Sequence, residues 1–223
     1  MPQSEVSLNK KLSLSLYFLI LLAWGLFPSL FLLERSGKID FWWGMCLNLV
    51  ILIGMSFLFE PGAISSLRED LSTKPAQKIV LGMVSALFLY GFFWVGREVV
   101  STVLSFASRE INAIYAFKGE APNWRIVLSM LLVIGPGEEI FWRGTLQRLL
   151  IQKTNPYWGF SLVLLCYTLV HTASFNLTLV GAAFICGFFW GALYWWRRSI
   201  LLNAISHTIW DILVFLLFPL AFR

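Results

Sequence analysis

The sequence has little charge. Asp, Glu, Lys and Arg make up 13% of its 223 residues, about half of the roughly 25% that soluble domains carry. Hydrophobic residues make up 58%, against roughly 45–50% in an average soluble domain. A globule with so few charged side chains would expose too much apolar surface to water. The composition therefore excludes an ordinary soluble protein and favours a membrane protein.

The sequence also lacks segments of about ten alternating apolar and polar residues, which are typical of transmembrane β-strands. Its apolar runs are continuous instead, and several reach the roughly 18 residues that a helix needs to cross a hydrocarbon core about 30 Å thick. Backbone groups in lipid must be satisfied within the spanning segment, so helices are expected to span. We predict an all-α, polytopic transmembrane helical bundle with seven to eight spans.

Cysteines are few and have no metal-ligand spacing. Cys46, Cys166 and Cys186 all lie inside apolar runs, so we interpret them as buried, inert thiols. The sequence has no tandem repeats, no low-complexity tracts and no sign of a second domain. Residues 1–223 are therefore predicted to form a single integral-membrane domain. The first apolar run is too long for a signal-peptide core and is expected to remain as an anchor.

Seven apolar segments are clear candidates for spans. They cover residues 14–33, 41–59, 79–96, 124–151, 158–171, 177–196 and 200–218. Gly135, Pro136 and Gly137 interrupt the fourth segment, and a bend is expected there because proline removes a backbone donor. The polar stretch 60–78 is expected to be an extramembrane loop. Residues 99–117 fit either an eighth span or an interfacial helix.

Tryptophan and basic residues supply the signals for topology. We interpret Trp42, Trp43 and the run 194–198 as interfacial anchors. Lys10 and Lys11 favour a cytoplasmic N-terminus, whereas the basic residues of the second half lie on the opposite side in an eight-span arrangement. Because the 17 basic residues are scattered, most of them in the short segments between apolar runs, the net charge of +5 does not indicate a nucleic-acid partner.

The second half contains ionisable residues inside apolar segments, where each costs at least about 2.5–3.5 kcal/mol on insertion scales. They are Glu138, Glu139, Arg143, His171, His207 and Asp211. The two histidines are the only ones in the sequence, and neither lies in a polar loop. Intramembrane ionisable residues usually mark a pathway, a relay or a site. Their placement therefore favours a function.

Spacing separates the two adjacent glutamates. Glu139 and Arg143 are four residues apart with the acid nearer the N-terminus, which is the favourable order for a helical ion pair. Glu138 has Trp142 at the corresponding position and so has no such partner. We therefore expect Glu139 to be structural and Glu138 to be free to act as a general base or acid.

The histidines lie in two further polar pairs. His207 and Asp211 are four residues apart, so one helix face presents both to the same space. Tyr167 lies one turn before His171 and would supply a hydroxyl on that face. Each pair alone is explained by packing between helices. Together, carboxylates and histidines on three helices exceed what packing requires.

Three motifs occur in order: EEIFWR at residues 138–143, YTLVH at 167–171 and HTIWD at 207–211. This arrangement resembles the CPBP family of intramembrane proteases, which includes CAAX prenyl proteases, bacteriocin-processing proteins and abortive-infection proteins. The resemblance covers residues 124–218, which are expected to form the catalytic core. Two positions depart from the commonest family pattern, because Tyr167 replaces Phe and Asp211 replaces Asn.

The resemblance implies an intramembrane endopeptidase that hydrolyses a peptide bond near the C-terminus of a membrane-associated or lipidated substrate. Glu138 would take a proton from a water molecule that His171 orients. His207 and Asp211 would stabilise the oxyanion or protonate the leaving amine.

Supporting roles and partners follow from the same resemblance. Glu139, Arg143 and Tyr167 would hold the catalytic residues in place. Besides the lipid bilayer, the partner would be a prenylated C-terminal tetrapeptide, a bacteriocin leader or a bacterial C-terminal sorting signal. The expected location is a bacterial or archaeal cell membrane.

The same residues leave a metal-dependent mechanism open. Two neutral imidazoles and a carboxylate form an acceptable open zinc site, so His171, His207 and Glu138 would hold one zinc ion. We prefer a mechanism without a cofactor, because no cysteine lies near a motif and the HExxH spacing of two ligands one turn apart is missing.

Two other classes of protein also use such residues. Transporters and proton relays contain intramembrane Glu, His and Asp, but a transporter is expected to have inverted repeats with broken helices in both halves, and only one break occurs. A catalytically silent immunity or scaffold protein is expected to lose at least one motif residue.

Overall fold

The computed structural model describes residues 3–222, with side chains from Leu14 onwards, and all regular secondary structure in this part is helical. The all-α prediction is therefore confirmed. The side chains of Lys10 and Lys11, on which part of the orientation prediction depends, lie outside the described residues. Residues 1–2 and 223 of the predicted single domain also lie outside the described residues.

Eleven α-helices occur in the described part, joined by short 3-10 and π segments. The first half contains α1 (Gln3–Arg35), α2 (Phe41–Phe59), α3 (Gly62–Ser72), α4 (Pro75–Val103), α5 (Ala107–Ile114) and the 3-10 turn η1 (Tyr115–Lys118). The second half contains α6 (Asn123–Ser129), the π segment η2 (Met130–Ile134), α7 (Gly135–Glu138), the π segment η3 (Glu139–Gln147) and α8 (Arg148–Lys153). It continues with α9 (Pro156–Val170), the 3-10 turn η4 (His171–Ser174), α10 (Leu177–Arg197), α11 (Ile200–Ile212) and the π segment η5 (Leu213–Leu217).

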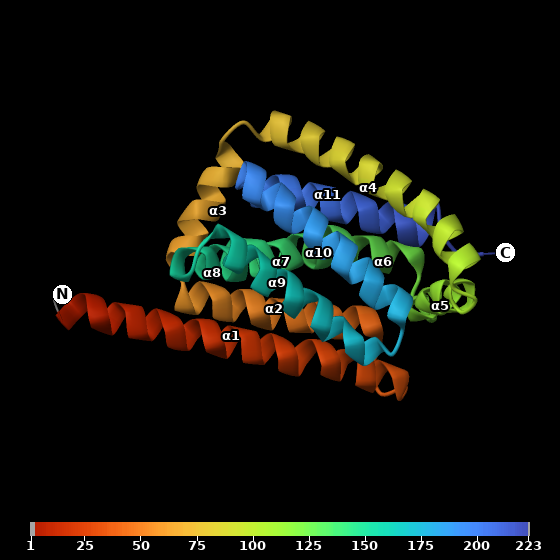
Figure 1. Ribbon diagram of the computed structural model, residues 1–223, viewed down its shortest axis with the longest axis horizontal. Helices are drawn as coiled ribbons and strands as arrows, with labels where there is room; N and C mark the ends of the chain where they lie inside the picture. The colour runs from red at the N-terminus through yellow and green to blue at the C-terminus, as the bar shows by residue number, and fades with distance from the viewer. Residues whose placement is uncertain (1–2, 223) are drawn as a thin grey trace.

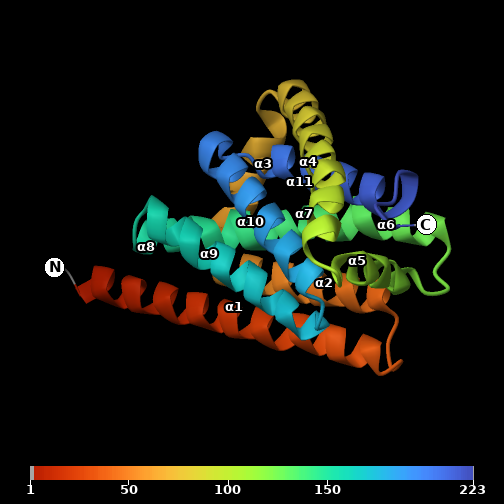
Figure 2. The same cartoon turned by 45° about the vertical axis from the view of Figure 1, so that its right-hand side comes forward.

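The long helices lie in layers, as Figure 1 and Figure 2 show. Helices α1 and α2 pack together along one side, and α4 packs on α11 along the other. The helical stretch from α6 to α8 runs between these layers. One cluster of buried apolar side chains joins α1, α2, this stretch and α9, and a second joins α4, α10 and α11.

Polar residues determine where four helices begin. They are Asp40 for α2, Asn155 for α9, Asn176 for α10 and Ser199 for α11. Each side-chain oxygen accepts a hydrogen bond from an amide of the first turn, which has no partner inside the helix. These caps place α9 and α11, which carry the second and third motifs.

Five helices of the described residues are long and apolar enough to cross a membrane. They cover Leu14–Arg35, Phe41–Phe59, Pro75–Val103, Leu177–Arg197 and Ile200–Leu217. The predicted seven to eight spans are therefore not confirmed. Helix α9 has 15 residues and rises only about 22 Å, and the stretch from α6 to α8 is divided among short α and π segments.

The structure corrects two local predictions and resolves a third. The stretch 60–78 is not simply a loop, because it contains helix α3. Trp42 is not an interfacial anchor, since its side chain is 2% exposed and packs edge-on against Phe215. The doubtful segment 99–117 does not form one span, because it is divided among the end of α4, the short helix α5 and the turn η1.

The Gly-Pro-Gly interruption does not separate two helices. Residues 123–153 stay helical throughout, and π segments lie directly before and after the four residues of α7. The interruption also permits close packing. A β-carbon on Gly135 would overlap the hydroxyl of Thr208 and lie 3.1 Å from its α-carbon. Gly135 therefore lets α7, which ends at Glu138, contact α11 beside His207.

We predict that Gly135→Ala lowers the stability of the protein by about 1–3 kcal/mol, because the added methyl group overpacks the contact between α7 and α11. The measurement is thermal unfolding of the purified protein in detergent. Gly91→Ala on α4 is the matched control, since nothing lies within 4 Å of its added β-carbon. Equal stability of the two variants would contradict the close packing at Gly135.

Candidate functional site

A mainly apolar cavity of about 390 Å³ lies inside the bundle. Its lining includes all four residues that the sequence suggests as catalytic, Glu138, His171, His207 and Asp211, together with Tyr167. These residues come from α7, η4, α11 and α9, so the fold gathers side chains that are up to 73 residues apart. Most of the remaining lining is aromatic or aliphatic.

Glu138 is a buried carboxylate without a complete set of partners. It ends α7, and its side chain is 4% exposed. Its Oε2 atom accepts no hydrogen bond from the described residues. A buried polar atom without a protein partner is costly unless water or a ligand satisfies it. Glu138 is thus available to bind a water molecule or a substrate in the cavity.

His171 presents one ring nitrogen as an acceptor. It follows the last turn of α9, and its Nδ1 lies 2.7 Å from the carbonyl oxygen of Tyr167. A carbonyl only accepts, so Nδ1 carries the proton and donates it. In the neutral ring, Nε2 therefore holds a free lone pair. Tyr167 thus accepts the hydrogen bond of His171 through its backbone carbonyl rather than through the predicted hydroxyl, and its ring also lies against the imidazole, with ring centroids 5.0 Å apart.

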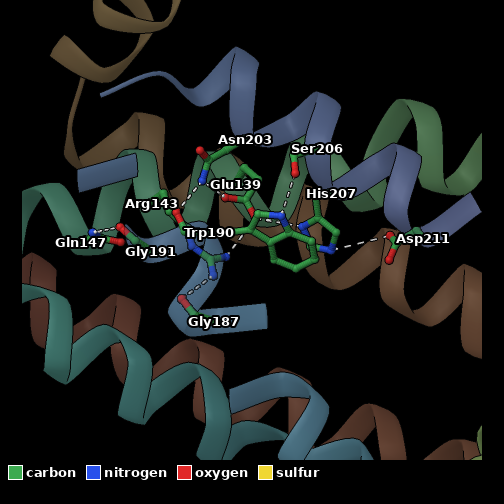
Figure 3. A network of polar contacts seen from close by, with 10 residues as sticks. All are labelled: Glu139, Arg143, Gln147, Gly187, Trp190, Gly191, Asn203, Ser206, His207 and Asp211. Atoms are coloured by element: carbon green, nitrogen blue, oxygen red, sulfur yellow. Dashed lines mark hydrogen bonds and ion pairs between the residues drawn. The ribbon is translucent and has the colours of Figure 1, made fainter. Parts of the chain in front are cut away.

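His207 is fixed on three sides. Its Nδ1 lies 2.8 Å from Oε1 of Glu139, and its Nε2 lies 3.6 Å from Oδ2 of Asp211. The ring also stacks on Trp190, with ring centroids 3.7 Å apart and planes inclined by 20° (Figure 3). Since a carboxylate accepts, Nδ1 donates to Glu139. The Asp211 contact is longer than a hydrogen bond, so Nε2 has no hydrogen-bond partner among the described residues.

Glu139 is the centre of a buried polar network (Figure 3). Its side chain is fully buried, and Nη1 of Arg143 lies 2.9 Å from its Oε1 atom, which is the ion pair that the spacing predicts. Asn203 donates from Nδ2 to Oε2 at 3.0 Å and to the carbonyl of Trp190 at 2.7 Å. Glu139 therefore connects α11 to the helical stretch that runs from α6 through α8.

Arg143 is enclosed by aromatic rings. Its guanidinium carbon lies 4.8 Å from the ring centroid of Tyr167 and 5.8 Å from that of Trp190. A guanidinium over an aromatic face gains cation–π attraction, which is larger when both groups are desolvated. The same group donates to the carbonyl of Gly187 at 3.4 Å. Tyr167 therefore supports Arg143 through its ring.

Sequence reasoning missed Asn203 and Trp190. Asn203, His207 and Asp211 follow one another at intervals of four residues on α11, so a search for polar stripes would have found Asn203. No comparable signal marks Trp190, because a single tryptophan in an apolar span resembles any other packing residue. Its indole nitrogen donates to Ser206 at 3.2 Å, which holds the ring that stacks on His207.

The structure does not assemble the zinc ligand set that the sequence left open. Among the described residues, no group of three or more His, Cys, Asp or Glu side chains has the geometry to hold a metal ion. His171, His207 and Glu138 share the cavity without forming such a group.

A known protein family matches part of the second half of the chain. Residues 120–213 match the family model of Rce1-like type II CAAX prenyl endopeptidases. This range, somewhat under half of the chain, contains all three motifs and confirms the resemblance drawn from them. No match to the chain was found among curated proteins or solved structures.

We predict that Arg143→Ala destabilises the protein by about 3–5 kcal/mol, because it leaves the buried Glu139 carboxylate without its cation. The expected result is a lower unfolding temperature in detergent together with lower activity. Glu98→Gln, which breaks an ion pair with a half-exposed carboxylate, is the control and should change stability by less than about 1 kcal/mol. An Arg143→Ala protein with unchanged stability but no turnover would show that Arg143 acts in the chemistry instead.

Proposed function

We propose that this integral membrane protein, whose residues 120–213 belong to the CAAX-protease-like family, is an intramembrane endopeptidase that uses glutamate-activated water. The substrate is a membrane-associated or lipidated polypeptide, cleaved near its C-terminus. The family match favours hydrolysis over transport or proton relay, which also use intramembrane Glu, His and Asp. Residues 124–218 form the catalytic core of a single membrane domain.

One observation carries the proposal: Glu138 has a buried carboxylate oxygen without a protein partner in a cavity that also contains two histidines. A water molecule bound there donates one proton to Glu138 and the other to the free Nε2 of His171. Glu138 then removes its proton as the water attacks the scissile carbonyl carbon. General-base catalysis of this kind contributes about 10²–10⁴-fold to a rate.

His207 and Asp211 act on the charge that develops on the oxyanion and on the leaving amine. When its ring is protonated, His207 donates from Nδ1 to Glu139 and presents an N–H at Nε2 to the oxyanion or the leaving amine. Asp211 lies 3.6 Å from that nitrogen and orients the ring. An ionised carboxylate cannot itself donate to an oxyanion, so Asp211 acts through His207.

The lining of the cavity supports a membrane substrate. Side chains such as Phe27, Phe31, Met45, Phe93 and Trp210 surround the polar residues with apolar surface. A lipidated or apolar segment gains free energy by leaving water for such a surface. The apolar lining also excludes bulk water, which strengthens each electrostatic contact near the scissile bond.

We predict that Glu138→Gln lowers the rate of cleavage by about 10²–10⁴-fold, because the amide cannot accept the proton of the attacking water. The assay uses purified protein in lipid nanodiscs. Its probes are peptides that carry a prenylated cysteine three residues from the C-terminus, and the same peptides without lipid. Glu120→Gln, on an exposed loop, is the matched control.

Three outcomes of this assay count against the proposal. Cleavage at an unchanged rate by Glu138→Gln would remove Glu138 from the chemistry. Equal cleavage of peptides with and without lipid would argue against a lipidated substrate. No cleavage of any membrane peptide by the unaltered protein would instead favour a catalytically silent scaffold.

We further predict that the protein still cleaves its substrate after prolonged chelation. Metal analysis of the same sample should show less than one metal ion per protein molecule. The proposed base is Glu138 itself, so removal of metal should leave the rate unchanged. Loss of activity on chelation and its return with one equivalent of zinc would establish a metal-dependent enzyme, with water activated on the ion.

A further inference from the structure

Residues 218–222 follow the last π segment in a non-helical conformation, at the end of the bundle where α5 lies (Figure 1). Their backbone is held by side chains of α4, α5 and η1, which precede them by more than 100 residues. These contacts join the segment to elements that are distant from it in the sequence.

The side chains hold alternate residues of the segment. Tyr90 donates from its hydroxyl to the carbonyl of Phe218 at 3.1 Å. Arg97 donates to the carbonyl of Leu220 at 3.3 Å. The amide of Leu220 donates to the hydroxyl of Tyr115 at 2.6 Å.

Asn112 completes this set at Phe222. Its Oδ1 accepts from the amide of Phe222 at 2.7 Å, and its Nδ2 donates to the carbonyl of the same residue at 3.1 Å. A side-chain amide offers one acceptor and a donor, as a backbone residue of a neighbouring strand does. Asn112 therefore pairs with the segment in the manner of a β-strand partner.

Tyr115 connects the segment to the bundle. Burial raises the pKa of Tyr115 above its ordinary value, so the hydroxyl keeps its proton. It donates that proton to the carbonyl of Val214 at 2.9 Å while it accepts from Leu220. Both hydrogen-bonding capacities of the hydroxyl are thus satisfied only when an amide occupies the position of the Leu220 N–H.

Leu220 inserts its side chain into the same cavity as the polar site. It is 6% exposed and lines the cavity together with Glu138, His207 and Asp211. The two residues before it, Phe218 and Pro219, are exposed, and Ala221 after it is half-buried. The segment therefore places one apolar side chain in the cavity, while side chains that include the cavity-lining Arg97 and Tyr115 hold its backbone.

We propose that Tyr90, Arg97, Asn112 and Tyr115 form a binding site for an extended polypeptide beside the cavity, and that residues 218–222 occupy it as an internal competitor. Contacts to backbone atoms do not depend on sequence, as is usual in strand-addition recognition. The ligand class is an extended peptide with a leucine-sized side chain for the cavity. The inference rests on the proposed function, because such a peptide would be the substrate segment next to the scissile bond.

The competitor has a measurable consequence. A tethered segment acts at an effective concentration in the millimolar range. If it fills the site in about nine of ten molecules, a free peptide binds to the intact chain about tenfold more weakly than to an open site. Removing the segment should therefore increase the affinity for an added peptide without changing the catalytic residues.

The test measures peptide binding rather than cleavage, so a negative result can be distinguished from a failure of the proposed protease function. The probe is a fluorescent pentapeptide with the sequence of residues 218–222, blocked at both ends. It is titrated in detergent against the intact chain and against a chain ending at Leu217, both carrying Glu138→Gln to prevent turnover. The expected result is saturable binding to the shortened chain, about tenfold tighter than to the intact chain.

Leu220→Asp in the intact chain provides a second route if the shortened chain does not fold, as judged by gel filtration and thermal unfolding. A carboxylate is too costly in the apolar cavity, so the segment leaves and the peptide should bind as tightly as to the shortened chain. A probe with Asp in place of its leucine should not bind.

Tyr115→Phe tests whether the added peptide binds at the site that the segment occupies. In a chain with the segment displaced, loss of the hydroxyl should weaken peptide binding by about three- to tenfold. Tyr17→Phe, at an exposed position of α1, is the matched control and should bind as before. Peptide binding that is no tighter after displacement of the segment, or that is unaffected by Tyr115→Phe, would overturn the proposal.

Discussion

The arrangement of the site depends on the buried carboxylate of Glu139. A fully buried carboxylate without donors is too costly to persist in an apolar interior. Here Arg143, Asn203 and His207 all donate to it. Arg143 lies on the same helical stretch as Glu139, whereas the other two donors lie on α11. The need to satisfy one charge therefore joins the two elements that carry Glu138 and His207, and it fixes the proton position on His207.

Adjacent residues in the same stretch thus have opposite environments. Glu139 is saturated with donors, and Oε2 of Glu138 has no partner among the described residues. Glu138 faces the cavity, where the apolar lining restricts water to the few molecules that polar atoms can hold. The network beside it joins the helical stretch that carries both glutamates to α11 through the two donors Asn203 and His207. In the proposed reaction, Glu139 therefore serves the structure, and its neighbour Glu138 serves as the base.

Much of the polar site follows from sequence spacing, because i,i+4 pairs on one helix share a face. The pairing of Glu139 with Arg143 and the common face of His207 and Asp211 were predictable in this way. The contact between Glu139 and His207 was not, since it joins residues 68 positions apart and depends on how two helices pack. The burial of Trp42 was missed because the sequence around a tryptophan at a helix start is the same whether its side chain faces the membrane interface or the protein core. Helix α3 was missed because its polar composition resembles that of a loop.

The position of Arg143 one turn after Glu139 also bears on how the chain enters a membrane. The two charges lie on one helical stretch, so they neutralise each other as that stretch forms, before any other helix supplies a partner. Asn203 and His207 are synthesised about 60 residues later, since domains emerge from the ribosome N-terminal part first. Formation of the ion pair and completion of the hydrogen bonds of Glu139 are therefore separate events in biogenesis, and the second waits for α11.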